Sequence, residues 1–287
     1  MPENQRAAGT PDRWDVGGLD VDACLHRIGL AGIDCAVPSP ELLRVLHRAQ
    51  VTTFSHENID VVLGRTVTVD VPSVQDKLVR RYRGGNCLEL NLLFAALLQR
   101  LGFTVTRLAG RVRMGSDVPR PRTHVMLQAD VDGRPWLADV GFGGPGLLDP
   151  LLFADGAAAV QDGWAYGLRQ MEDGQWVLHA DRDAEGTFDL YSFTREPQHP
   201  VDYVVANHYI TTHPRSPFTG RLIVQRSLPE QRLLLRGTTL VRTSPGGEER
   251  AEKVSAAEVP RLLADDFAIE LEDADADALC ALLSRDG

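Results

Sequence analysis

The chain of 287 residues lacks several features that would place it in a specialised class of proteins. It has only four cysteines, none of them in a CxxC pair, so neither a zinc site nor a disulfide framework is indicated. No apolar run approaches the length of a membrane span, and the first residues show no signal-peptide pattern. We therefore expect a protein of a reducing, cytoplasmic compartment, without a metal site and without a membrane partner.

An excess of basic residues is also missing. Lys and Arg total 30 against 40 Asp and Glu, which gives a formal net charge of −10. This balance argues against a nucleic-acid partner, and an anionic small molecule would need a local basic patch. The charged fraction of 24% and the hydrophobic fraction of 43% are ordinary for a globular protein, and the length allows two or three subdomains.

The most informative stretch that is present is YRGGNCLELN at residues 82–91. Its two glycines allow a tight bend, and apolar residues recur at helical spacing directly after them. Cys87 is therefore expected in the first turn of a buried helix, where free N–H groups and the helix dipole favour a thiolate. This makes Cys87 a candidate nucleophile. The alternative is a small, inert apolar residue, which is the more common role of a lone free cysteine.

The first part of the chain is predicted to be largely helical. Asp20, Ser39-Pro40 and Ser73 are each typical of helix starts, because their side chains can accept the free N–H groups of a first turn. The helix from Cys87 follows them. We assign these helices to a first domain, residues 1–102.

After this domain, apolar and polar residues alternate, as they do in strands. Asp132-Gly133 and Asp173-Gly174 are strong signals of hairpin turns. We therefore expect residues 103–193 to form an antiparallel sheet or a small barrel. Residues 194–220 are rich in Pro and His without a clear period and are assigned as an interdomain segment. The last part, 221–287, mixes strand-like and helical runs.

Two residues on either side of the first hairpin turn could complete a nucleophilic site. With a two-residue or four-residue loop, His124 and Asp139 fall on the same face of the sheet, directly or diagonally opposite. A three-residue loop would place them on opposite faces. On a shared face, Asp139 would orient the imidazole and His124 would take the proton of Cys87. The alternative is that both residues only hydrogen-bond within the sheet.

A glycine-rich turn follows Asp139 directly. Gly141, Gly143 and Gly144 lie on both sides of Phe142, and the backbone amides of such a turn could approach an anion or a pantetheine arm. A flexible loop of the barrel would explain the same glycines equally well.

Together, these motifs resemble the arylamine N-acetyltransferase family. The matching segments occur over most of the chain in the family's order: ENID at 57–60, RGGNCLELN at 83–91, THV at 123–125, DVGFGG at 139–144 and NHYITTHPRSPF at 207–218. The resemblance implies an α+β fold, with an N-terminal helical bundle, a central antiparallel β-barrel and a C-terminal α/β lid. It also implies a triad arranged as in cysteine proteases.

The resemblance further implies a two-step transfer. Cys87 would take acetyl from acetyl-CoA, release CoA and pass the acetyl group to an arylamine, arylhydrazine or N-hydroxyarylamine. His124 would be the base and Asp139 the orienting residue. No permanently bound cofactor is implied, because acetyl-CoA is the donor substrate. Arg83 and Glu57 resemble a structural ion pair that supports the site.

The substrate contacts are also expected by resemblance. The acceptor pocket would be lined by Phe142, Phe218 and His56, and CoA would be contacted by Thr123, Gly141, Gly143 and Gly144. His56 departs from the family pattern, which often has PFEN where this chain has SHEN at residues 55–58. An imidazole then replaces one aromatic wall of the pocket, and this puts the amine specificity in question.

Two other enzymatic functions fit the same residues. An amide synthase of ansamycin biosynthesis uses the same triad on a carrier-bound polyketide, and a thiol hydrolase would pass the acyl group to water. A non-catalytic CoA-binding module is disfavoured by the complete Cys/His/Asp set. The sequence leaves open the physiological acceptor, the preference among acetyl, propionyl and longer donors, and the assembly, for which a homodimer is one option.

Overall fold

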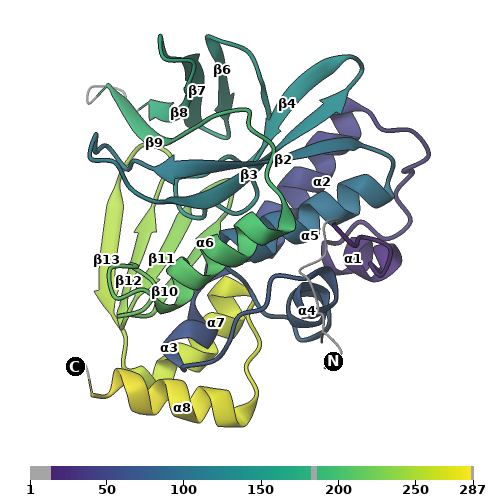
Figure 1. Ribbon diagram of the computed structural model, residues 1–287. Helices are drawn as coiled ribbons and strands as arrows, with labels where there is room; N and C mark the ends of the chain where they lie inside the picture. The colour runs from purple at the N-terminus through teal and green to yellow at the C-terminus, as the bar shows by residue number, and fades with distance from the viewer. Residues whose placement is uncertain (1–13, 182–185, 286–287) are drawn as a thin grey trace, which may run out of the picture.

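The computed structural model describes residues 14–181 and 186–285. Figure 1 shows three parts: a group of N-terminal helices, an eight-stranded antiparallel sheet, and a C-terminal five-stranded sheet with its own helices. The helices are α1 (Val21–Arg27), α2 (Pro40–Thr53), α3 (Ile59–Val62), α4 (Val71–Gln75), α5 (Cys87–Arg100), α6 (Pro200–Thr212), α7 (Val259–Phe267) and α8 (Asp273–Leu283). Within the described part of the chain, no helix is both long and apolar enough to cross a bilayer.

The N-terminal helices begin at side chains that accept backbone N–H groups. Asp20 caps α1 and Ser39 caps α2, as the sequence predicts. The prediction of a helix start at Ser73 is wrong, because Asp70 is the N-cap of α4 and accepts the Ser73 N–H at 2.8 Å. Helix α4 continues directly into the π-helical segment Asp76–Arg80. Such segments are rare and often lie at functional sites.

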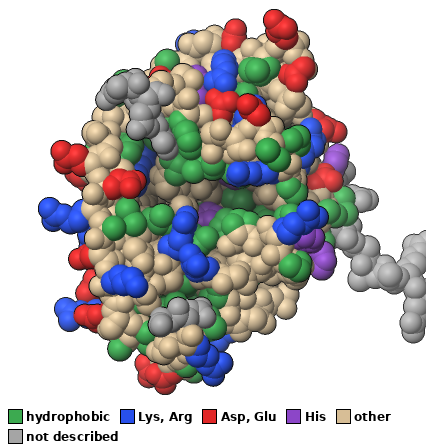
Figure 2. All heavy atoms as spheres, turned by 90° about the vertical axis from the view of Figure 1, so that its left-hand side faces the viewer, with side chains coloured by type: hydrophobic (Ala, Val, Ile, Leu, Met, Phe, Trp, Pro, Cys, Tyr) green, Lys and Arg blue, Asp and Glu red, His purple; other side chains and the backbone are tan. Residues whose placement is uncertain are grey.

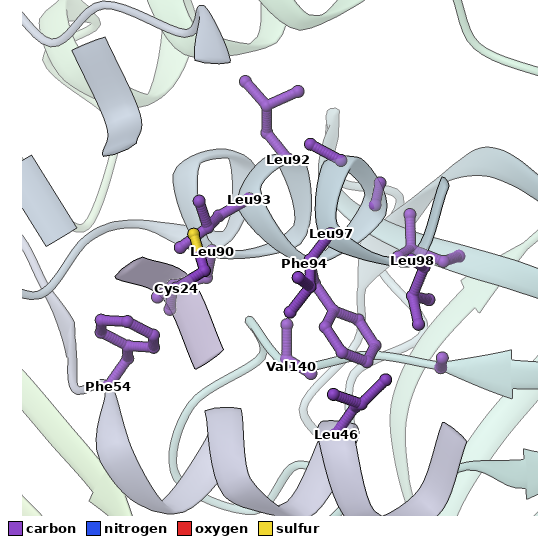
Figure 3. Packing of buried hydrophobic residues seen from close by; sticks show 14 of the residues in the cluster. Cys24, Leu46, Phe54, Leu90, Leu92, Leu93, Phe94, Leu97, Leu98 and Val140 are labelled. Carbon is purple, nitrogen blue, oxygen red and sulfur yellow. The ribbon is translucent and has the colours of Figure 1, made fainter. Parts of the chain in front are cut away.

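Helix α5 forms the centre of the N-terminal part. Every residue from Cys87 to Leu98 is buried, which is typical of a helix surrounded by other elements on all sides. It packs against α2 and α4 and against strands of the large sheet. Figure 3 shows Leu46 of α2 and Val140 next to Phe94 of α5. The start of α5 is therefore held rigidly, and Cys87 with it.

The large sheet is nearly closed into a barrel, because its two edge strands, β5 and β6, lie side by side. Its strands, in spatial order, are β5 (Leu151–Leu152), β4 (Arg134–Ala138), β3 (Arg122–Val131), β2 (Thr104–Val112), β9 (Thr187–Phe193), β8 (Trp176–Asp181), β7 (Trp164–Gln170) and β6 (Ala157–Gln161). The expected antiparallel barrel is thus present. Its apolar core includes the fully buried rings of Tyr166 and Tyr191.

The turn between β3 and β4 sets the register that matters for the site. Val131 pairs with Arg134, so the loop contains only Asp132 and Gly133. Both loop residues have positive φ, 51° and 69°, the geometry of a type I′ hairpin. The two-residue alternative considered from the sequence is the one that occurs.

Helix α6 lies in a segment whose sequence shows no clear period. Its buried residues Tyr203, Asn207 and Ile210 share one face, but one of them is polar. Val201 and Val205, by contrast, are exposed. Because apolar residues do not mark the buried face, the helix could not be recognised by periodicity.

The C-terminal part is built on a sheet of five antiparallel strands. These are, in spatial order, β1 (His56–Glu57), β10 (Ile223–Ser227), β11 (Arg232–Arg236), β12 (Thr239–Thr243) and β13 (Glu249–Lys253). The strand-like runs expected after residue 221 are confirmed by β10, β11 and β12. Strand β1 comes from the N-terminal helical part, so the two parts share one sheet. Action of the C-terminal part as a lid stays a prediction.

Candidate active site

Cys87 is the first residue of α5 and is 6% exposed. The Asn86 side chain before it accepts the Leu88 and Glu89 N–H groups, and the Glu89 carboxylate accepts the Asn86 N–H at 2.8 Å. This reciprocal capping box fixes the first turn of the helix. The Cys87 thiol contacts the Thr123 carbonyl at 3.5 Å. The sulfur therefore lies where the α5 start meets strand β3.

His124 and Asp139 meet as the hairpin register requires. The last pair of the β3–β4 ladder is Leu127 with Ala138, and His124 and Asp139 lie just beyond it, diagonally opposite. The His124 Nε2 atom is 2.7 Å from the Asp139 Oδ2 atom, and both side chains are buried. The argument from loop parity is therefore confirmed for this pair.

The second interaction of the His124 ring is with Cys87. Burial on its own lowers the pKa of His124, but the Asp139 charge and hydrogen bond, together with a hydrogen bond to Cys87, raise it to about 10. Because Nε2 faces Asp139, the other ring nitrogen, Nδ1, is left for the thiol. The three residues thus form a continuous chain of contacts from sulfur to carboxylate.

The Asp139 carboxylate is fully supplied with donors. Its Oδ1 atom accepts from the Asn91 side chain at 3.1 Å and from the Gly141 N–H at 3.0 Å. Burial on its own raises the pKa of Asp139, but His124, Asn91 and Gly141 together hold it below its usual value. Asp139 therefore stays ionised in a buried position.

Asn91 joins all the parts of this site. Its side-chain nitrogen also lies 3.2 Å from the Cys87 carbonyl and 2.8 Å from the Val125 carbonyl, and its oxygen accepts the Val140 N–H at 3.2 Å. Asn91 was part of a matching motif, but no role was assigned to it from the sequence. The available signal was a polar residue in an otherwise apolar stretch, one turn after Cys87.

The glycine-rich turn packs directly on the helix start. A Cβ atom on Gly141 would lie 2.9 Å from the Cys87 carbonyl oxygen and 3.0 Å from its Cα atom, so only glycine fits there. Gly143 has a φ of 74°, in the left-handed region, and a Cβ atom on it would collide with Gln225. Two of the expected CoA contacts, Gly141 and Thr123, therefore touch Cys87. Contact of these glycines with CoA stays a prediction.

Of the three residues expected to line an acceptor pocket, Phe142 and His56 line a cavity beside the triad, and Phe218 packs behind His56. The Phe142 ring centroid is 4.9 Å from that of His124, and the Phe218 ring centroid is 5.3 Å from that of His56. Tyr191 was not expected; its ring is 4.8 Å from His124. A small cavity beside the triad is lined by Val51, Phe54, His56, Leu90, Asp139, Val140, Phe142, Gly143, Gly146, Leu147, Gln225 and Ser227. Phe218 does not line this cavity, but its ring packs against His56, which does.

His56 is a buried polar residue, and one of its ring nitrogens lacks a hydrogen-bond partner among the described residues. The residue is 4% exposed, and the nitrogen without a partner in the described part of the chain is Nδ1. Burial, and then the nearby His124, lower its pKa to about 4, although Glu57 and Asp139 act in the opposite direction. At neutral pH His56 is therefore an uncharged imidazole at the cavity wall.

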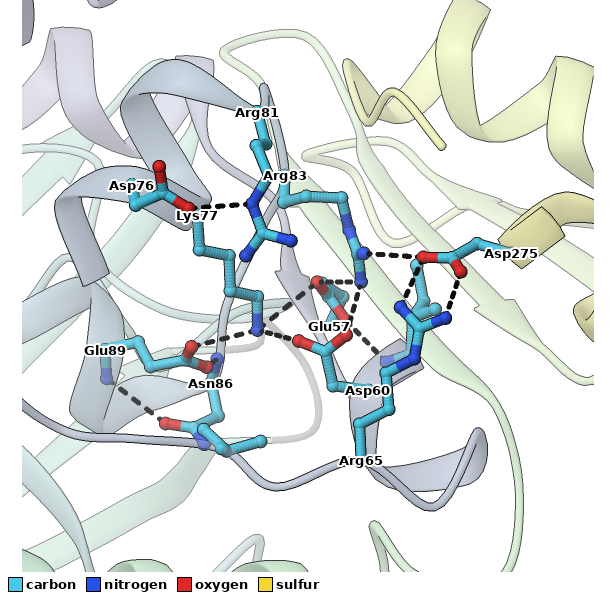
Figure 4. Close-up of polar contacts among 12 residues, drawn as sticks. Glu57, Asp60, Arg65, Asp76, Lys77, Arg81, Arg83, Asn86, Glu89 and Asp275 are labelled. Carbon is cyan, nitrogen blue, oxygen red and sulfur yellow. Dashed lines mark hydrogen bonds and ion pairs between the residues drawn. The ribbon is translucent and has the colours of Figure 1, made fainter. Parts of the chain in front are cut away.

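A buried ion-pair network extends from the capping box into the protein (Figure 4). Lys77, on the π-helical segment, contacts Glu89 at 2.9 Å, Asp60 at 2.7 Å and Glu57 at 3.7 Å. Burial lowers the pKa of Lys77, but the three carboxylates raise it above its usual value. The lysine thus holds the residue, Glu89, that caps the start of α5.

The same network reaches the C-terminal helix α8. Arg83 contacts Glu57 and Asp60, each at 3.2 Å, so the ion pair expected between Arg83 and Glu57 is present. Arg83 also lies 3.6 Å from Asp275 of α8, which is paired with Arg65. Charged side chains therefore connect the start of α5 with the last helix of the chain.

The surface between the barrel and the C-terminal sheet is hollowed. Figure 2 shows this hollow with a histidine visible inside it and with Lys and Arg side chains along its rim. The chain as a whole carries a formal charge of −10. A local basic rim is the feature that an anionic ligand would need on such a chain.

Comparison with known proteins gives consistent matches along the chain. A family model described as N-acetyltransferase matches residues 40–276. The arylamine N-acetyltransferase / N-hydroxyarylamine O-acetyltransferase of Salmonella typhimurium is 36% identical over 243 residues, which cover 83% of this chain and 85% of the relative. The arylamine N-acetyltransferase structure from Mycobacterium abscessus matches with a TM-score of 0.89 and 36% identity over 99% of both chains. The Mycobacterium marinum enzyme in complex with CoA matches with a TM-score of 0.84 and 31% identity, over 93% of this chain and 99% of that one.

The fold and these matches define an acyltransferase. The chain belongs to the arylamine N-acetyltransferase family. The resemblance seen in the sequence is thereby confirmed, and with it the α+β architecture of N-terminal helices, a near-closed barrel and a C-terminal sheet with helices.

Proposed function

We propose that this chain transfers acetyl from acetyl-CoA, through a thioester on Cys87, to an aromatic amine or hydrazine. The observation that carries the proposal is the line of contacts from the Cys87 thiol through His124 to Asp139. A thiol becomes a strong nucleophile when an adjacent base takes its proton, and His124 is hydrogen-bonded to Cys87 for that role.

The transfer takes two half-reactions. In the first, the Cys87 sulfur attacks the acetyl carbonyl, the bond from that carbon to the CoA sulfur breaks, and His124 gives its proton to the departing CoA thiolate. In the second, the amine nitrogen attacks the acetyl carbonyl, its proton passes to His124, and the bond to Cys87 breaks. Asp139 holds the imidazole in one orientation and remains ionised throughout.

Two observations support acetyl-CoA as the donor. The related Mycobacterium marinum protein was solved in complex with CoA. The hollow in Figure 2 has a basic rim, which suits the phosphates of CoA. We place the thioester end of the donor against Thr123 and the turn that contains Gly141, Gly143 and Gly144. Thr123 and Gly141 contact Cys87, and Gly143 lines the cavity beside the triad.

We assign the aromatic ring of the acceptor to the space beside Phe142, His56 and Phe218. The name of the Salmonella relative includes both arylamine and N-hydroxyarylamine acceptors. In this chain the neutral His56 presents an unpaired ring nitrogen. Leaving a buried polar atom unpaired costs about 1–3 kcal/mol, so His56 favours arylamines that carry a hydroxyl or carboxyl group able to pair with it.

The proposed function is tested by the release of free CoA thiol from acetyl-CoA. Without an acceptor, release should stop when each protein molecule has turned over once. Adding an arylamine should make release continuous. Continuous release without an acceptor would indicate a hydrolase, and no release at all from acetyl-CoA would indicate a different donor, such as a carrier-bound polyketide. Either result would contradict the proposal.

A further inference from the structure

His47 is a fully buried histidine of α2 that has two hydrogen bonds. Its Nε2 atom accepts the backbone N–H of Asp139 at 3.1 Å, and its Nδ1 atom lies 3.0 Å from the Leu148 carbonyl oxygen. The ring also packs edge-on against Phe94 of α5 at 5.7 Å between centroids. His47 thus contacts the main chain of Asp139, whereas His124 contacts its carboxylate.

The two hydrogen-bond partners of His47 determine the tautomer and the protonation state of its ring. A backbone N–H can only donate, so Nε2 must carry the lone pair. The proton is therefore on Nδ1, where it is donated to the Leu148 carbonyl. A doubly protonated ring would place an N–H against the Asp139 N–H and break the bond. Only the neutral ring with its proton on Nδ1 fits between the two groups.

The backbone of Asp139 needs this partner. The β3–β4 ladder ends at Leu127 and Ala138, so the Asp139 N–H lies beyond the last ladder pair. A buried backbone N–H without an acceptor is strongly disfavoured. The hydrogen bonds of Asp139 with His124, Asn91 and Gly141 all involve its carboxylate, so none of them occupies its N–H.

We propose that His47 is a positioning residue for acetyl transfer: in its neutral form it fixes the main chain of Asp139, and thereby the carboxylate that orients His124. The inference rests on the proposed function of the triad. His47 does not touch the reacting atoms. It acts by anchoring the end of β4 to helix α2, so that the Asp139 carboxylate keeps its distance to the imidazole.

The surroundings of His47 keep it neutral. Burial lowers its pKa below the ordinary value, whereas the bond to Leu148 and the charges of Asp149 and Asp139 act to raise it. The remaining charged neighbour, Arg48, lowers it further. The net effect is a ring that stays uncharged near neutrality and gains its second proton only in acid.

Two substitutions separate the two bonds of the ring. The side-chain oxygen of His47→Gln reaches the place of Nε2 and can still accept from Asp139. His47→Asn reaches only the place of Nδ1, keeps the bond to Leu148 and loses the one to Asp139. We expect the single-turnover rate of Cys87 acylation to fall about 10- to 100-fold in His47→Asn, as for a small displacement of a catalytic group, and much less in His47→Gln. His26→Asn, on the exposed side of α1, is the control and should keep the wild-type rate.

A double-mutant cycle with Asp139→Asn distinguishes positioning from a general structural effect. If His47 acts through Asp139, adding His47→Asn to Asp139→Asn should reduce acylation little further. The inference would be overturned if the fold-losses of the two single variants multiplied in the double variant. It would also be overturned if His47→Gln and His47→Asn lost acylation rate equally. If the inference fails in this way but Cys87 of the wild-type protein is still acetylated, the proposed function remains supported.

The pH profile provides a second test that does not need a folded His47→Asn variant. A glutamine at position 47 cannot be protonated. Acylation by His47→Gln should therefore decline less in acid than acylation by the wild type, measured by single-turnover CoA release. Superimposable acid limbs would overturn the inference.

Discussion

The side-chain nitrogen of Asn91 lies 3.1 Å from the Asp139 carboxylate, and this bond connects the helix that carries Cys87 to the strand end that carries Asp139. Asn91 also binds the main chain of β3 through the Val125 carbonyl. Asn91 therefore links the three elements that carry Cys87, His124 and Asp139.

Replacement of Asn91 by leucine should affect both stability and activity. The change keeps the number of side-chain heavy atoms but leaves buried acceptors unpaired, and each such group costs about 1–3 kcal/mol. We expect the midpoint of urea unfolding to fall and the acylation rate to drop more than tenfold in the protein that remains folded. A folded variant with the wild-type acylation rate would show that Asn91 does not position the triad.

His56 should make the protein less stable in acid. Its folded pKa of about 4 lies below its ordinary value of 6.5, so the unfolded chain binds the proton more tightly. Its contribution to stability is present above pH 6.5 and is lost as the pH falls towards 4. The full shift corresponds to about 3 kcal/mol. The free energy of unfolding of His56→Phe, measured in urea, should therefore decline less between pH 6.5 and 4 than that of the wild type; parallel curves would contradict this.

The same variant tests the choice of acceptor. If His56 pairs with a polar substituent, His56→Phe should shift the ratio of kcat/KM from hydroxyl- or carboxyl-bearing arylamines towards alkyl anilines. The loss of one hydrogen bond to a neutral group corresponds to a shift of about tenfold. The acylation half-reaction, which precedes acceptor binding, serves as the internal control and should change little. An unchanged ratio would place His56 outside the acceptor pocket.

Lys77 is expected to be essential for stability. Lys77→Met leaves the carboxylates of Glu89 and Asp60 without their buried partner, and such a loss costs about 3–5 kcal/mol. The matched control is Arg81→Met, because Arg81 pairs with Asp76 at the exposed surface, where a pair contributes about 0–1 kcal/mol. Both values come from urea unfolding. Equal losses in the two variants would show that the buried network does not support the start of α5.

Much of the site could be predicted because its signals are local. The turn residues Asp132-Gly133 define a two-residue loop, and side-chain parity then brings His124 and Asp139 to one face. Asn91 and His47 could not be assigned in this way. Their partners lie on other elements, and only the packing of α2 and α5 against the barrel determines which atoms they meet.

The fold was harder to predict where burial and polarity disagree. Helix α6 buries the polar Asn207 and exposes Val205, so its sequence shows no apolar face. The start of α4 was misplaced because Asp70 and Ser73 are both good capping residues, and the carboxylate of Asp70 takes the position. Strand β1 has only two residues, and its pairing with β10 depends on a distant part of the chain.

The central claim is that Cys87 carries the acetyl group, and mass spectrometry of the protein after incubation with acetyl-CoA alone tests it most directly. We predict the mass of one added acetyl group, localised by peptide mapping to Cys87, and its loss when an arylamine is added. Cys87→Ala should remain folded and show no such adduct. Acetyl on Cys24, Cys35 or Cys280 instead, or an unmodified protein, would contradict the account.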